Sequence, residues 1–186
     1  MSKIDIGGDA RIYTRDEWEA RPWRGFTHQR DEQLTQVFIH HTVHERAEVL
    51  DHWEEQVAAM QGMQNFHMDT RGYDDIGYSF VVFQQFGNVG VTRILQGRPV
   101  NHVTAAQTPN TGKIAISVVG NFQGDDGVKD KTVTAIVELI KHVRENNNDR
   151  LTFIGGHRDI NETTCPGTAL MAKIPEIAKR TGLRRL

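Results

Sequence analysis

Short apolar runs rich in β-branched and aromatic residues alternate with amphipathic segments, and this alternation is what most limits the possible folds. The runs at 36–42, 77–86, 91–95, 114–119 and 151–154 indicate strands, with a hairpin turn over 85–90. Apolar residues at helical spacing predict helices over 48–63, over 133–143 with a stop at Asn146, and over 169–179, which only Pro175 interrupts. Strands and helices interleave without a strict strand–helix–strand period. We therefore expect an α/β fold with a mixed central β-sheet flanked by helices.

The chain has 186 residues, which is room for one ordinary domain. We expect a single domain over residues 1–186, with residues 1–35 as an N-terminal arm that packs on it and carries a short helix near 15–20. No stretch approaches the roughly 20 apolar residues that a membrane span needs. The first residues lack the apolar core of a secretory signal. These features predict synthesis in a cytoplasm and no membrane insertion.

Charge and motifs exclude several classes of protein. Lys and Arg number 22 and Asp and Glu number 24, so the formal charge of −2 argues against a strongly basic nucleic-acid binder. The sequence has no phosphate-binding P-loop, no dinucleotide-binding glycine motif, no Gly-x-Ser-x-Gly elbow and no His-Glu-x-x-His zinc motif. We expect no nucleic-acid partner.

One cysteine stands beside nine histidines, so no disulfide can form within the chain. His40 and His41 end a predicted buried strand, His157 follows another strand and two glycines, and Cys165 comes eight residues later. Two imidazoles and one thiolate, with a fourth position left for water, are typical of a catalytic zinc site. The bland alternative is that each histidine is an ordinary core or surface residue and the cysteine a small buried apolar side chain. These residues alone leave both interpretations open, and strand alternation does not choose between His40 and His41.

Four segments, in order, carry a resemblance to a known family. They are Phe38-Ile39-His40-His41-Thr42; residues 64–69 with 75–80; Asn101-His102 with Asn110 and residues 114–117; and residues 156–167, which include Gly156-His157-Arg158-Asp159 and Thr163-Thr164-Cys165-Pro166-Gly167. They resemble the zinc amidases of the peptidoglycan recognition protein and phage lysozyme amidase superfamily, the type 2 amidases. A shorter similarity at 15–21 resembles the N-terminal motif of the recognition proteins. The resemblance covers residues 12–175 and implies the peptidoglycan-recognition-protein-like amidase fold.

The resemblance assigns roles position by position. It implies that Zn²⁺ is held by His40, His157 and Cys165, and that Tyr78 is the catalytic tyrosine. Thr163 stands where some phage enzymes have a lysine and many recognition-protein amidases a threonine, so its share in catalysis stays open. Arg71 could pair with a peptide carboxylate or be a solvated loop residue, and His67 could be a packing histidine. The candidates for substrate contact are His41, His67, Arg71, Tyr73, His102 and Asn110.

The activity that the resemblance implies is hydrolysis of the amide between N-acetylmuramic acid and L-alanine in peptidoglycan. Tyr78 would hydrogen-bond the attacking water or the developing oxyanion. Noncatalytic members of the superfamily typically lack the cysteine ligand, so Cys165 favours an enzyme over a pure binding module. We expect a monomeric, bacteriolytic phage endolysin that acts on the cell wall without a separate wall-binding domain. The alternatives are a noncatalytic recognition module and a host autolysin or recycling amidase.

Overall fold

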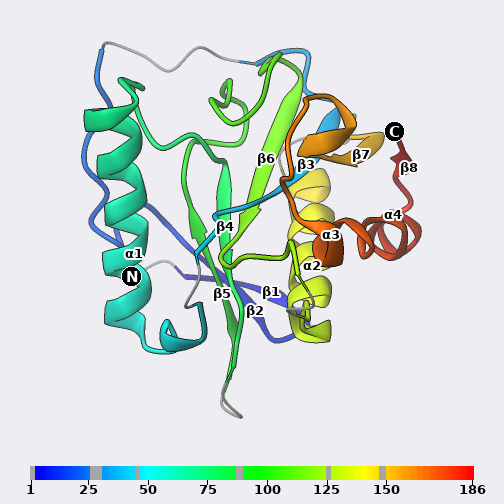
Figure 1. Cartoon of the computed structure of the whole chain (residues 1–186), viewed down its shortest axis with the longest axis horizontal. Coiled ribbons are helices and arrows are strands. Elements are labelled where there is room, and N and C mark those ends of the chain that lie inside the picture. The colour runs from blue at the N-terminus through cyan, green and yellow to red at the C-terminus, as the bar shows by residue number, and fades with distance from the viewer. Residues whose placement is uncertain (1–2, 26–30, 45–46, 87–89, 125–126, 147–149) are drawn as a thin grey trace.

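A computed structural model describes residues 3–25, 31–44, 47–86, 90–124, 127–146 and 150–186 (Figure 1). Within these residues, eight strands form one sheet in the order β1-β2-β5-β4-β6-β3-β7-β8. β1 with β2 and β4 with β5 pair antiparallel, and the other neighbours pair parallel, so the predicted mixed sheet is confirmed. The strands are β1 (Ile4–Gly7), β2 (Ala10–Tyr13), β3 (Gln36–His41), β4 (Phe80–Phe83), β5 (Thr92–Gln96), β6 (Lys113–Val118), β7 (Phe153–Gly156) and β8 (Arg184–Arg185).

Helices cover both faces of the sheet, with α1 on one side and α2 and α4 on the other (Figure 1). Alternate residues of β4 show why both faces are apolar: Phe80 and Val82 join the core under α2, whereas Val81 and Phe83 join the core under α1. None of the helices among the described residues has the length and apolar character needed to cross a bilayer. The helices are α1 (Trp53–Asn65), α2 (Asp130–Asn146), α3 (Thr168–Met171) and α4 (Ile174–Thr181), with a π-helical turn (Phe66–Thr70) and 3₁₀ turns (Ala47–Val49 and His157–Asp159).

The prediction for the N-terminal arm was wrong in two respects. Its first half forms β1 and β2, which extend the edge of the sheet beside β5. The predicted helix near 15–20 is a turn, in which the Ala20 N–H donates to the Arg15 carbonyl and Glu19 has φ of 55°. The turn inserts Trp18 into the core, where it is fully buried and its indole N–H donates to the Gln96 carbonyl. Burial of this indole explains why the local sequence does not continue as a helix.

The other boundaries differ less from the predictions. The helix predicted over 48–63 is a 3₁₀ turn followed by α1, and the closing helix is split into α3 and α4, with Pro175 in the first turn of α4. The strand predicted over 77–86 is confined to β4. Residues 87–89 of the predicted hairpin turn lie outside the described residues, although β4 and β5 pair antiparallel on either side of it.

Candidate functional site

Two of the predicted metal ligands are brought together by parallel strand pairing. Ile39 of β3 is in register with Gly156 of β7. Because the two strands are parallel, the residues that follow, His40 and His157, lie side by side. The centroids of the two imidazole rings are 4.7 Å apart. β3 is paired on both sides, with β6 and with β7, and this pairing fixes the position of its end in the sheet.

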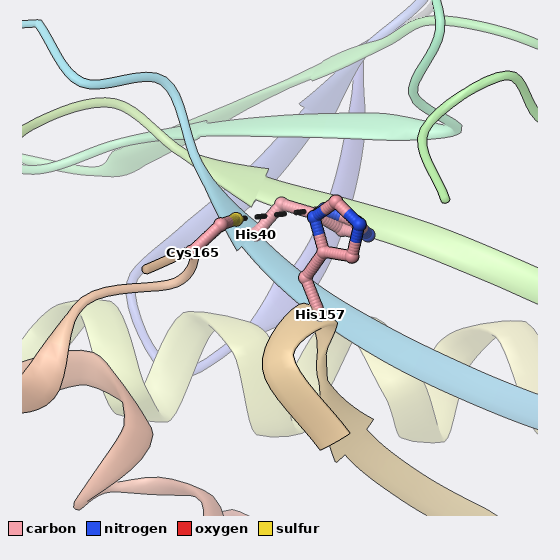
Figure 2. A group of neighbouring side chains, drawn as sticks. All are labelled: His40, His157 and Cys165. Carbon is pink, nitrogen blue, oxygen red and sulfur yellow. Dashed lines mark hydrogen bonds between the residues drawn. The ribbon is translucent and has the colours of Figure 1, made fainter. Parts of the chain in front are cut away.

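Cys165 reaches the same point from the loop after β7, as Figure 2 shows. Its carbonyl accepts a hydrogen bond from the Arg158 N–H at 3.0 Å, and its own N–H donates to the Thr163 hydroxyl at 3.2 Å. The sulfur accepts the His41 N–H at 3.4 Å and lies 3.7 Å from His40 Nδ1. One candidate donor atom from each of His40, His157 and Cys165 lies within 4.8 Å of the others.

The chemistry of this donor set fits zinc. Two imidazole nitrogens and one sulfur are preferred zinc ligands, and three protein ligands leave a position open for water or substrate. Burial lowers the pKa of His40 to about 3 and also lowers the pKa of His157, so both imidazoles are neutral at pH 7, as metal ligands must be. Burial raises the pKa of the Cys165 thiol to about 11. A cation at the centre of the cluster would favour the thiolate over the thiol.

Tyr78 lies beside the cluster, just before β4, with its ring centroid 5.6 Å from that of His40. Its segment is held in place because the Arg98 N–H donates to the Tyr78 carbonyl at 2.9 Å. Burial raises the pKa of the Tyr78 phenol to about 12, and the neighbouring Ser117 hydroxyl partly offsets the rise. The phenol is therefore protonated at neutral pH and can act as a hydrogen-bond donor.

A cavity of about 300 Å³ opens beside His157. Of the predicted groove residues, Tyr73 and Asn110 line it. The His67 ring lies between the two tyrosines, 5.6 Å from Tyr73 and 5.5 Å from Tyr78, and its Nδ1 accepts the Gly77 N–H at 3.1 Å. His67 thus packs against Tyr73 of the cavity lining and does not itself line the cavity. The full lining is Tyr73, Ala105, Ala106, Gln107, Thr108, Asn110, His157 and Asn161.

Three other predicted groove residues lie apart from this cavity. His41 points to the opposite face of β3 and is only 4% exposed, with its Nδ1 accepting the Phe122 N–H, so it offers a substrate almost no surface. Arg71 is exposed, and its guanidinium lies over the Phe66 ring at 5.3 Å. His102 is half-buried and does not line the cavity.

The structure also reveals polar residues that the sequence interpretation missed. Gln107 Oε1 lies 2.8 Å from His40 Nε2, and Asn161 Oδ1 lies 3.0 Å from His157 Nε2. Ser117 is in register with His40 on β6 and is fully buried. Asn161 follows His157 by four residues, a spacing that could have suggested contact across one turn, whereas nothing in the local sequence marks Gln107.

Comparison with known proteins identifies the fold and the family. A family model described as N-acetylmuramoyl-L-alanine amidase (Amidase_2) matches residues 30–168. The N-acetylmuramoyl-L-alanine amidase of Sus scrofa is 32% identical over 166 residues, which are 88% of this chain and 26% of that protein, so the chain spans about a quarter of its length. Peptidoglycan-recognition protein SC1a of Drosophila melanogaster is 30% identical over 88% of this chain and 83% of its own length.

Solved structures agree with the sequence matches. The ectodomain complex of peptidoglycan recognition proteins LCa and LCx, solved with tracheal cytotoxin bound, matches with a TM-score of 0.74 and 30% identity over 89% of this chain and 95% of that chain. The family model covers well over half of the sequence and includes both His40 and Cys165. The chain therefore belongs to the N-acetylmuramoyl-L-alanine amidase family, Amidase_2, and has the fold of the peptidoglycan recognition proteins.

Proposed function

We propose that this protein is a zinc-dependent amidase that cleaves the bond between N-acetylmuramic acid and L-alanine in peptidoglycan. The observation that carries the proposal is the approach of His40, His157 and Cys165 to within 4.8 Å beside a cavity and a protonated tyrosine. The family description supports the choice of bond. Tracheal cytotoxin, a monomeric diaminopimelic acid-type peptidoglycan that is bound in the related complex, supports the choice of polymer.

The proposed chemistry divides between the metal and the chain. When bound, zinc would polarise the amide carbonyl and lower the pKa of water to about 7. His40, His157 and Cys165 would hold it and leave the cavity side open. Tyr78 would donate its phenolic hydrogen bond to the oxygen on which negative charge develops. The Thr163 hydroxyl accepts the Cys165 N–H, so its first role is to shape the ligand loop.

The peptide would occupy the cavity beside His157. Tyr73 offers an aromatic surface there, and residues 105–108 also line the cavity. A cavity of about 300 Å³ accommodates a few residues of a stem peptide rather than a folded protein. Arg71 does not line this cavity, so it could pair only with a peptide carboxylate that lies outside it.

A second candidate is recognition of peptidoglycan without cleavage. The related recognition protein complex holds tracheal cytotoxin, and the same fold could serve binding alone. Digestion of purified peptidoglycan, read by mass spectrometry of the fragments, separates the two. The amidase predicts new free L-alanine amino groups, loss of this product with a chelator, and recovery with added zinc.

Cys165→Ala is the informative variant. His142→Ala is the control, because His142 lies on α2 beside Ile4 and Ile12 and is not one of the clustered candidate ligands. We expect Cys165→Ala to abolish cleavage while the chain remains folded, and His142→Ala to cleave at the wild-type rate. Cleavage that ignores the chelator and survives Cys165→Ala would contradict the zinc mechanism. Retained binding to peptidoglycan with no product from the zinc-loaded wild type would favour recognition.

We further propose bacterial wall lysis, the role of a phage endolysin, over a recycling role. Added protein should then clear suspensions of whole cell walls. Activity restricted to small soluble muropeptides would favour a recycling amidase. The relatives described above are animal proteins, so a phage source stays a prediction.

A further inference from the structure

Both candidate imidazole ligands meet a side-chain amide at the nitrogen that faces away from Cys165. His40 Nε2 lies 2.8 Å from Gln107 Oε1, while its Nδ1 faces the sulfur. His157 Nε2 lies 3.0 Å from Asn161 Oδ1. An amide oxygen only accepts hydrogen bonds, so each contact requires a proton on Nε2 of the imidazole. That leaves both Nδ1 atoms unprotonated and available to a metal.

The orientation of the Asn161 amide follows from its backbone partners. Its Oδ1 accepts the Thr108 N–H at 3.0 Å, and its Nδ2 donates to the Thr108 carbonyl at 2.8 Å. A flipped amide would set its N–H against the Thr108 N–H and its oxygen against the carbonyl oxygen. Only the amide orientation that directs Oδ1 toward His157 therefore satisfies both the N–H and the carbonyl of Thr108.

Gln107 is held by its own short loop. Its Nε2 donates to the Thr104 hydroxyl at 2.9 Å, and the side chain is 4% exposed. Asn110 Oδ1 accepts the N–H groups of both Ala106 and Gln107 at 3.1 Å, which closes the loop. The segment 104–110 therefore contacts His40 directly through Gln107 and His157 indirectly through Thr108 and Asn161.

We propose that Gln107 and Asn161 are positioning residues that keep the proton of the His40 and His157 imidazoles on Nε2. The segment 104–110 thereby supports both candidate ligands at once and sets the affinity for zinc. The inference rests on the proposed function for the identity of the metal. Removal of a hydrogen-bond partner behind a metal-bound histidine typically weakens metal binding about 10–100-fold. Because Thr108 and Gln107 belong to one loop, loss of Asn161 should also loosen the support of His40.

Zinc affinity of the full chain, measured by competition with a chromophoric chelator, tests the proposal without peptidoglycan. Gln107→Met keeps side-chain length but removes the acceptor, and Gln123→Met is the matched control at an exposed glutamine. Asn161→Ala serves as the second variant, because Asn161 is only half-buried and the fold should tolerate its loss. We expect each of Gln107→Met and Asn161→Ala to raise the zinc Kd about 10–100-fold, and Gln123→Met to leave it unchanged. The double variant should lose less than the product of the single effects, since Asn161 is hydrogen-bonded to the loop that carries Gln107.

The tautomers give a readout that general loosening of the fold would not reproduce. Nitrogen-15 NMR of the zinc-free wild type should show His40 and His157 with the proton on Nε2, and each variant should show a mixture at the histidine it supports. Wild-type imidazoles with the proton on Nδ1, or variants that bind zinc as tightly as the wild type, would overturn the inference. If zinc binding and tautomers behave as expected but no amide is cleaved, the proposed function fails and the inference stands.

Discussion

A buried ion pair between Arg15 and Asp75 joins the N-terminal turn to the segment that carries Tyr78. Removing it tests how much this pair contributes to the stability of the fold. Asp75 is fully buried, and its Oδ2 lies 2.8 Å from Nη1 of Arg15, whose side chain is 15% exposed. Asp75 Oδ1 accepts hydrogen bonds from Gln64 Nε2 at 2.6 Å and from the Ile76 N–H at 2.8 Å. Arg15 Nη1 also donates to the Gly97 carbonyl at 2.8 Å. The pair thus joins four segments of the chain.

Asp75→Asn preserves the shape and the Oδ1 acceptor but sets an amide N–H against the guanidinium of Arg15. Breaking a buried pair by neutralising one partner costs about 3–5 kcal/mol, because the remaining charge stays buried without compensation. Domains of this kind are stable by about 5–15 kcal/mol, so the loss is a large share of the total. At about 2–4 °C per kcal/mol for a chain of this length, the unfolding midpoint should fall by roughly 10 °C.

Urea denaturation followed by circular dichroism, together with thermal melts, measures this loss. Asp69→Asn is the control, because Asp69 pairs with Arg21 at 2.7 Å while 48% exposed, and exposed pairs contribute little. Arg15→Met in the Asp75→Asn background should destabilise much less than Arg15→Met alone, since no lone charge remains. Equal midpoints for Asp75→Asn and Asp69→Asn would refute the claim that this pair stabilises the turn.

Three further outcomes can be measured on the same protein. Tyr78→Phe should lower kcat about 10²–10³-fold, because it removes one hydrogen-bond donor to the developing negative charge, and zinc affinity should be retained. An unchanged kcat in muropeptide digestion would exclude Tyr78 from the chemistry. Gly167→Ala should lower the free energy of unfolding, measured by urea denaturation, by at least about 2 kcal/mol. Gly167 has φ of 90°, and a Cβ there would collide with the Phe122 carbonyl. A urea midpoint equal to that of the wild type would show that the loop can relax. Burial lowers the pKa of His67 to about 4, so only the unfolded chain takes up its proton as pH falls from about 6.5 to about 4, and the folded state loses stability across that range. Relative to a His67→Gln variant, the wild type should lose about 1 kcal/mol between about pH 7.5 and pH 5.5, and a difference independent of pH would contradict this assignment.

The sequence predicted the inner strands and the long helices because their signals are local. Val133, Ile136 and Ile140 recur at helical spacing, and α2 buries all three. β3 is a short apolar run, and it is an inner strand with β6 and β7 on either side. The strands at the N-terminal edge were missed because β1 is mostly exposed and has no continuous apolar face. The segment around Glu19 was predicted to be a helix, since nothing in the local sequence indicates the positive φ of Glu19 or the burial of Trp18.

The candidate site also has residues that the sequence indicated and residues that it did not. Composition left His40 and His41 equivalent, and the family resemblance chose His40. The register of Ile39 with Gly156 gives the physical reason, because it sets His40 beside His157 while His41 turns toward Phe122. Gln107 was beyond reach of the sequence, because its contact with His40 joins residues 67 positions apart.

The candidate metal ligands and the residues that hydrogen-bond to them come from different kinds of segment. The imidazoles come from strand ends that sheet pairing holds in place, whereas their Nε2 partners, Gln107 and Asn161, come from two loops that also line the cavity. Asn110 illustrates the overlap, since it borders the cavity and its side chain holds the N–H of Gln107. A loss of kcat/KM on changing such a residue does not identify a substrate contact, because weaker zinc binding would produce the same loss. Substrate contact follows only where activity falls at saturating zinc and the zinc affinity is unchanged.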